Sequence, residues 1–133
     1  MYLFISPHDL AYAVFGLVQE VNGVAEGEKI KKVETRPEQI LEHLLQYLQE
    51  VSIDPCDLEG VIVVTGPGSF TALRAGVSVV NTFAFVHEKP LISVPNKELK
   101  DISELLKEVD FTKLNTFVTP FYGREPNITK PKV

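Results

Sequence analysis

The chain has 133 residues, and 13 lysines and arginines against 18 aspartates and glutamates give it a formal net charge of −5. This length fits one domain, and 44% hydrophobic with 23% charged residues excludes a disordered chain, a collagen-like fibre and a repeat array. The acidic balance argues against a broad basic face for nucleic acid. A single cysteine, Cys56, excludes an internal disulfide. The N-terminus lacks the basic start of a signal peptide, so we expect a cytoplasmic protein that makes no membrane contact.

The first 34 residues predict three antiparallel strands. Residues 2–5 form a short β-favouring run, and residues 12–21 form a second one. Asn22-Gly23 then gives a strong hairpin signal, because both residues tolerate a positive φ. The return strand is expected mainly over residues 30–33, since Gly27 interrupts the run before it.

A helix is expected from Thr35 to about residue 51. Thr35 and Glu38 have the spacing of a capping box, and apolar residues then recur at helical spacing as far as Val51. Residues 61–64 are four β-branched residues in a row, which is typical of a central strand covered on both faces.

The second half of the chain alternates in the same way. We expect a helix over residues 70–86, a short strand over 91–94, an amphipathic helix over 97–109 and a last short strand over 116–118. The order βββαβαβ predicts an α/β fold. A meander followed by right-handed crossovers would form a mixed sheet with flanking helices, the ribonuclease-H-like arrangement.

The helix at 70–86 is apolar all round. From Val61 to His87 the only formally charged side chain is Arg74, yet the glycines and proline at 66–68 break the run and exclude a membrane span. A helix without a polar side should be buried on every side, and the sheet can cover only one. We therefore predict that a partner chain covers the other side, unless the helix after residue 97 does so. The predicted partner interface consists of Leu73, Gly76, Val77, Val80, Phe83 and Ala84.

The glycine-rich turn before this helix is a candidate nucleotide or anion site. Backbone N–H groups and the helix dipole favour an anion between a strand and a helix start, and the residues concerned are Gly66, Gly68, Ser69 and Thr71. It is not a P-loop, because no lysine follows. The alternative is a tight turn in which glycine supplies an unusual φ and Ser69 caps the helix.

Other chemistry has little support in the sequence. The histidines His8, His43 and His87 are scattered without metal-ligand spacing, so we expect no metal site and no catalytic acid–base pair. Arg124, Lys130 and Lys132 give the tail a local positive excess, which would suit a phosphate backbone or simply a solvated C-terminus.

The segment at 65–77, Thr-Gly-Pro-Gly-Ser-Phe-Thr-Ala-Leu-Arg-Ala-Gly-Val, closely resembles the G-P-G-S-F-T-G-L-R-x-G motif of the TsaB (YeaZ) family. Residues 92–95 match the strand that follows this motif in the family, and residues 120–125 resemble its closing P-x-Y-x-R segment. The resemblance covers residues 1–95 in order and returns near 118–125.

This resemblance implies the first lobe of an actin-like ATPase (ASKHA) fold. Family members take part in forming threonylcarbamoyladenosine in tRNA as non-catalytic scaffolds. They form a heterodimer with a TsaD-type transferase, which a TsaE-type ATPase joins. The resemblance therefore implies contact with tRNA only through the complex. It implies no cofactor held by this chain alone, with ATP and Mg²⁺ bound by the assembled complex.

The departures from the family pattern bear on catalysis. Ser6-Pro7 stands where relatives carry Asp-Thr, so a carboxylate that could serve a metal–nucleotide is missing at that place, unless Asp9 substitutes for it. Only twenty-four residues separate Pro95 from Pro120, where the family places most of a second lobe. We therefore expect a first lobe over 1–95, a second-lobe remnant over 96–133, and no enzymatic activity of the chain by itself. The alternatives are a homodimeric interaction module and a residual nucleotide-binding domain.

Overall fold

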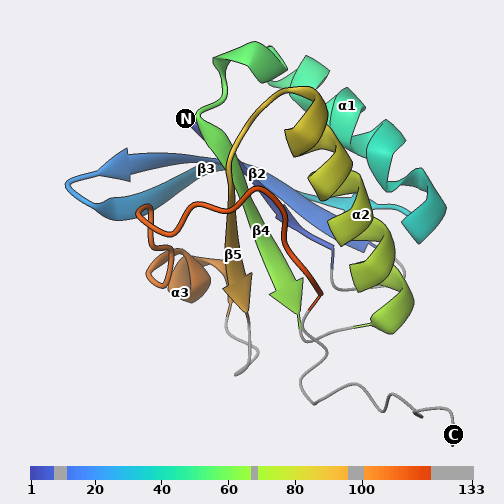
Figure 1. Ribbon diagram of the computed structural model, residues 1–133. Coiled ribbons are helices and arrows are strands. Elements are labelled where there is room, and N and C mark those ends of the chain that lie inside the picture. Colours follow the sequence, from blue (N-terminus) through green and yellow to red (C-terminus); the bar gives the residue numbers. More distant parts are fainter. Residues whose placement is uncertain (8–11, 67–68, 96–100, 121–133) are drawn as a thin grey trace, which may run out of the picture.

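The computed structural model describes residues 1–7, 12–66, 69–95 and 101–120 and contains a five-stranded mixed sheet in the order β3-β2-β1-β4-β5 (Figure 1). The strands are β1 (Tyr2–Ser6), β2 (Tyr12–Val21), β3 (Val24–Glu34), β4 (Gly60–Gly66) and β5 (Leu91–Pro95). Strand β2 is antiparallel to both of its neighbours, β1 and β3, whereas β1, β4 and β5 run parallel. This order confirms the predicted α/β class and the ribonuclease-H-like arrangement.

The β2–β3 hairpin confirms the turn prediction and extends it. Asn22 and Gly23 have φ values of 52° and 79°, and Val21 pairs with Val24 across them. However, β3 is longer than expected, because Gly27 does not interrupt it. A Cβ at Gly27 would lie 2.8 Å from Cδ1 of Leu106, so the glycine leaves room for a helix that packs on the strand. The irregularity comes later, at Lys29, where φ is 52° and the register shifts.

The helices begin and end differently from the prediction in two places. A single 3₁₀ turn, η1 (Pro37–Gln39), precedes α1 (Ile40–Glu50), and its N-cap is Arg36, with no side-chain cap. The predicted capping box is therefore wrong, because the Thr35 hydroxyl donates to the Arg36 carbonyl instead. The other helices are η2 (Pro55–Asp57), α2 (Phe70–Val86) and α3 (Ile102–Leu106). The α3 helix is short, and part of the range predicted for it, 97–100, lies outside the described residues.

The strands bury both faces of the sheet, as alternation along a strand requires (Figure 1). Helices α1 and α2 cover one face, where Leu3, Ile5, Phe15, Val61, Val63 and Leu91 are buried. Helix α3 covers the other face, where Phe4, Val18, Ile62, Val64 and Ile92 are buried. No helix among the described residues is long and apolar enough to cross a membrane.

The segment after α3 returns to the sheet and ends beside α2. Asn115 and Leu91 exchange two backbone hydrogen bonds, each 2.8 Å long, and this single bridge replaces the predicted strand at 116–118. The Asn81 side chain of α2 then donates to the Val118 carbonyl at 2.9 Å and accepts from the Val118 N–H at 2.8 Å. Residues 101–120 therefore pack against the same sheet and helix as the rest of the chain.

Candidate functional site

The turn between β4 and α2 has the geometry of a capped helix start. Gly66 is buried with a φ of 117°, a conformation that favours glycine. Ser69 is the N-cap of α2, and its Oγ accepts from the Ala72 N–H at 3.4 Å. Both features fit the tight-turn alternative. Gly68 lies outside the described residues, and anion binding stays a prediction.

Thr71, the last residue predicted for the anion site, is exposed in the first turn of α2. It lines a shallow hollow of about 350 Å³ with Arg74, Ala75 and Ser78. This hollow lies along the outer side of the helix, so the structure directs Thr71 toward the helix surface that Arg74 and Ser78 share.

The structure corrects the predicted partner interface on α2. All six residues assigned to it are buried within the chain; Leu73 is 0% exposed and Phe83 is 4% exposed. They form the stripe that faces the chain's own sheet. Gly76 is part of this contact, because a side chain there would collide with Cβ and Cγ of Pro7. A pattern that is apolar on two sides does not reveal which side faces the sheet.

The outer side of α2 is weakly polar and largely exposed. Its exposed residues are Thr71, Arg74, Ser78, Thr82, Phe85 and Val86. The Thr82 hydroxyl donates a hydrogen bond to the Ser78 carbonyl at 3.0 Å, so its hydrogen-bonding partner lies within the same helix. Helix α3 lies on the opposite face of the sheet, so the alternative that it covers this side of α2 is wrong. Helix α1 packs beside α2 and leaves Val79 half-buried.

The single cysteine, Cys56, lies exposed in η2 and is not activated as a nucleophile. The Asp54 carboxylate accepts from the Cys56 N–H at 2.8 Å, and that hydrogen bond lowers the pKa of Asp54. Hydrogen bonding to Asp54 and its negative charge raise the pKa of the exposed Cys56 thiol, which keeps it protonated. Within the described ranges no cluster of three or more histidine, cysteine or acidic side chains could hold a metal ion.

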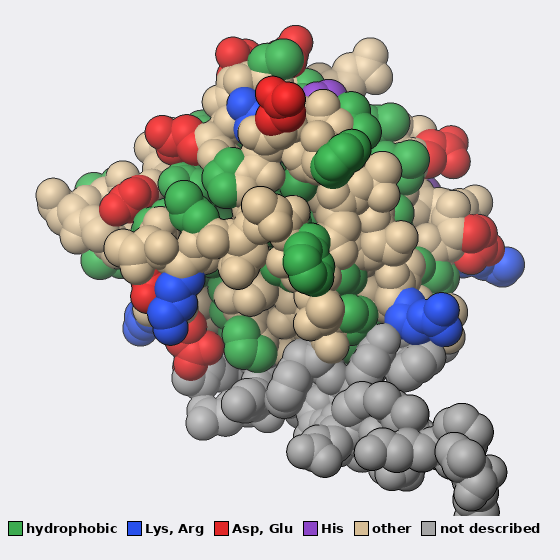
Figure 2. Space-filling model, in the orientation of Figure 1, with side chains coloured by type: hydrophobic (Ala, Val, Ile, Leu, Met, Phe, Trp, Pro, Cys, Tyr) green, Lys and Arg blue, Asp and Glu red, His purple; other side chains and the backbone are tan. Residues whose placement is uncertain are grey.

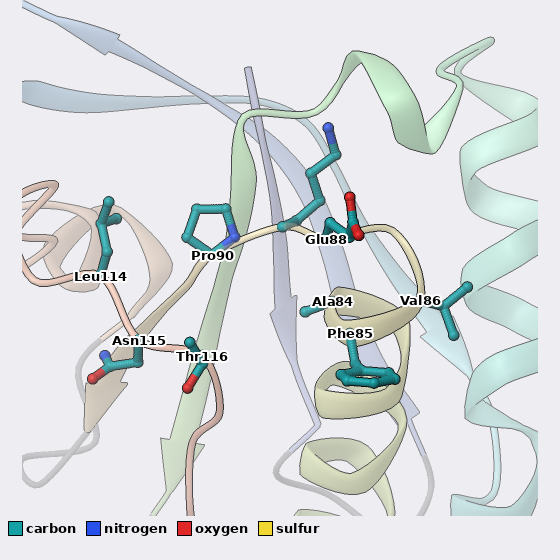
Figure 3. A pocket seen from close by; sticks show the side chains of 9 residues that line it. Ala84, Phe85, Val86, Glu88, Pro90, Leu114, Asn115 and Thr116 are labelled. Atoms are coloured by element: carbon teal, nitrogen blue, oxygen red, sulfur yellow. The ribbon is translucent and has the colours of Figure 1, made fainter.

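One groove went unpredicted from the sequence. It lies between the end of α2 and residues 114–116 and has a volume of about 630 Å³ (Figure 3). Phe85 and Val86 are apolar residues outside the buried stripe of α2, and this position is the one feature of the sequence that could have indicated the groove. The sequence does not indicate that Leu114 lies at the groove, because the bridge that places it there joins Asn115 to Leu91, two residues far apart in sequence.

A family model supports the resemblance carried by the sequence motif. The model described as TsaD, tRNA N6-adenosine threonylcarbamoyltransferase, matches residues 34–100, which is half of the chain. This range includes α1, the turn after β4, and α2.

Several curated proteins with that description are similar in sequence. The tRNA N6-adenosine threonylcarbamoyltransferase of Halalkalibacterium halodurans is 36% identical over 83 residues, which are 62% of this chain and 24% of that protein. The Bradyrhizobium protein is 34% identical over 74 residues, which are 54% of this chain and 21% of that protein. The chain thus spans about a quarter or less of the length of these relatives.

Solved structures share the fold. YeaZ from Pseudomonas aeruginosa aligns with a TM-score of 0.55 at 21% identity, over 71% of this chain and 44% of that one. Thermus thermophilus RuvC aligns with a TM-score of 0.51 at 16% identity, over 74% of this chain and 66% of that one. At these identities the likeness shows a common architecture, which agrees with the strand order of the sheet.

Proposed function

Because the chain belongs to the TsaD family of tRNA N6-adenosine threonylcarbamoyltransferases, we propose that it takes part in forming threonylcarbamoyladenosine in tRNA. Its role in this proposal is that of a non-catalytic subunit that docks on a TsaD-type transferase. The transferase contacts the tRNA, and any site for ATP and Mg²⁺ belongs to the assembled complex.

The observation that carries the docking proposal is the outer side of α2. Thr71, Ser78 and Thr82 are small, exposed residues along this side, and a partner helix can approach closely where side chains are small. Charged residues are depleted in the centre of protein interfaces. Of the six exposed residues on this side of α2, Arg74 is the only charged one.

Helix α1 extends this surface with further apolar area. Leu41 and Leu45 lie one turn apart, and each is about half exposed, at 47% and 49%. Because α1 packs beside α2, the two helices offer a continuous surface for a partner. The proposed interface is therefore the outer side of both helices, not the stripe of α2 that covers the sheet.

Support for a non-catalytic role comes from the end of β1. Ser6 and Pro7 are buried there, and Pro7 packs against Gly76 of α2. Neither residue offers a carboxylate to the metal of a metal–nucleotide, and Asp9, which could substitute for one, lies outside the described residues.

A binding experiment with the TsaD-type transferase of the same organism tests the docking. Ser78→Arg with Thr82→Arg adds two large charged side chains to the outer side of α2 without touching the core. We expect this double variant to bind at least ten times more weakly, as measured by biolayer interferometry. Ser93→Arg, on an exposed position of β5, is the matched control and should bind like the wild type.

Two results would contradict the proposal. Equal affinity of the double variant and the control would exclude docking through α2. Transfer of threonylcarbamoyl to tRNA by the purified chain alone would exclude the non-catalytic role. Light scattering on the chain by itself separates a homodimer from a subunit that awaits a different partner.

A further inference from the structure

The outer edge of β3 is a long, exposed strand edge. Strand β3 ends the sheet order, and within the described part of the chain no strand lies beyond it (Figure 1). All of its residues except Ala25 and Val33 are exposed. Figure 2 shows the hairpin of β2 and β3 projecting from the body of the molecule. Because every second residue of an antiparallel strand directs its N–H and C=O away from its neighbour, β3 presents backbone groups to which a further strand can bind.

The charged residues of β3 are sorted by sign along the strand. In chain order they are Glu26, Glu28, Lys29, Lys31, Lys32 and Glu34. The first half of the strand is thus acidic, and the second half is basic apart from its last residue. A row of like charges would repel the same strand of a second copy, which is one way in which proteins protect exposed edges. Here an antiparallel second copy would meet opposite charges instead.

Contacts with neighbouring elements hold the basic half of β3 in position. The Lys31 ammonium lies 2.7 Å from Oε2 of Glu50 in α1, and the Lys32 ammonium lies 3.6 Å from the centre of the Tyr12 ring in β2. The side chains of Lys31 and Glu50 are 50% and 54% exposed. Since an ammonium has three donors, Lys31 can bind a second carboxylate without losing the first.

The irregularity of β3 at Lys29 determines which of its side chains share a face. Glu28 lies opposite Leu17, and Lys31 lies opposite Phe15. Both of these β2 residues are buried on the sheet face that α1 and α2 cover, so Glu28 and Lys31 point to the same face. In a regular strand two residues at this spacing would point to opposite faces. A two-fold axis through the irregularity, perpendicular to the sheet, therefore places Glu28 of each copy beside Lys31 of the other.

We propose that β3 pairs antiparallel with β3 of a second copy of this chain, so that the two sheets become continuous. Backbone hydrogen bonds along the outer edge join the strands, as in other cases of strand addition. Two symmetric ion pairs between Glu28 and Lys31 set the register. The contact uses none of the residues proposed for docking on the transferase, so the two interfaces are independent.

Sedimentation velocity on a concentration series of the purified chain tests this pairing. A contact through one strand of each copy buries little surface, so we expect a weak dimer with a Kd in the micromolar range. The dimer should dissociate further as ionic strength rises, because the ion pairs are exposed to solvent.

Two charge-reversal variants assign the dimer to β3. Glu26→Lys with Glu28→Lys makes the first half of the strand basic, and Lys31→Glu with Lys32→Glu makes the second half acidic. Each variant alone should dimerise at least tenfold more weakly than the wild type, because like charges then face each other. An equimolar mixture of the two should associate again, because opposite charges meet once more. This recovery is a result that damage to folding cannot produce.

A matched control separates this contact from an effect of net charge. Asp57→Lys with Glu88→Lys makes the same change of charge at exposed positions outside β3, and it should dimerise like the wild type. A chain that stays monomeric at millimolar concentration, a dimer that both β3 variants leave intact, or a mixture that does not associate would each overturn the proposal. So would a dimer that Ser78→Arg with Thr82→Arg dissociates, because that dimer would form through α2. The transferase-binding experiment uses other residues, so the two proposals fail separately.

Discussion

Helices α1 and α2 cover the same face of one sheet, but they reach it by different means. Helix α2 lies close, since Gly76 leaves room for Pro7 and the small residues Ala72 and Ala84 are fully buried. Helix α1 buries larger side chains instead, and Tyr47 is one of them. Tyr47 packs on Phe15, with ring centroids 5.5 Å apart, and its hydroxyl donates to the Lys29 carbonyl at 2.7 Å.

The difference indicates which substitutions each helix can tolerate. Close packing through small residues leaves no space for an added atom. Helix α1 instead packs through the larger buried side chains of Ile40, Leu44 and Leu48, and the Tyr47 hydroxyl adds one polar contact with β3. An added side-chain atom should therefore be costly over much of the inner side of α2, whereas on α1 the polar contact with the sheet is concentrated at Tyr47.

The largest effect is expected from a charge in the inner stripe of α2. Val77 is 2% exposed, and Val77→Asp buries a carboxylate with no partner, which should lower the free energy of unfolding by about 3–5 kcal/mol. Urea unfolding followed by circular dichroism measures this. Ser78→Asp, one residue further on and exposed, should change the same quantity by no more than about 0.5 kcal/mol. Similar losses for both variants would contradict the orientation of α2.

A smaller but more specific effect is expected at Gly76. Alanine favours a helix by up to about 1 kcal/mol relative to glycine, so an open site would gain stability from Gly76→Ala. Here the added methyl collides with Pro7, and overpacking of this kind costs about 1–3 kcal/mol. We expect a net loss in urea unfolding. In a double-mutant cycle Pro7→Gly should recover part of it, and simple additivity of the two changes would rule out the contact.

The sequence predicted the fold well because several local signals agreed. Asn22-Gly23 specified the hairpin, the spacing of apolar residues specified α1, and the β-branched run at 61–64 specified a central strand. Together they determine the order of elements, and right-handed crossovers then leave few topologies.

The candidate site was predicted less well, and the reasons are tertiary. Both sides of α2 look apolar in the sequence, and the contact of Gly76 with Pro7, about seventy residues away, decides which side is buried. The groove depends on the bridge between Leu91 and Asn115, two residues in no common pattern. Local periodicity carries no information about such contacts.

The attachment of residues 111–120 to α2 should respond to Asn81→Ala. This change removes both hydrogen bonds to Val118, each worth about 1 kcal/mol. We expect amide hydrogen exchange at residues 115–118 to accelerate more than exchange in β1 or β4, because the segment would detach locally. Thr82→Ala, on the exposed side of the same helix, should leave that exchange unchanged. Uniform acceleration across the sheet would instead mean that Asn81 supports the whole fold.

Tyr47→Phe tests the polar contact between α1 and β3. It keeps the ring on Phe15 and removes the bond to the Lys29 carbonyl, so we expect a loss of about 1 kcal/mol in urea unfolding at pH 8. Burial, with smaller contributions from Glu28 and Glu50, raises the pKa of Tyr47 to about 12. Since this lies above the ordinary value near 10, the wild type should lose the contribution of Tyr47 as the pH rises from about 10 to about 12. The variant lacks this loss, so the stabilities of the two proteins should converge above pH 10. Tyr2, whose pKa burial also raises, is present in both proteins and cancels in the comparison. A constant difference from pH 8 to pH 11.5 would show that the Tyr47 hydroxyl is not buried against the strand.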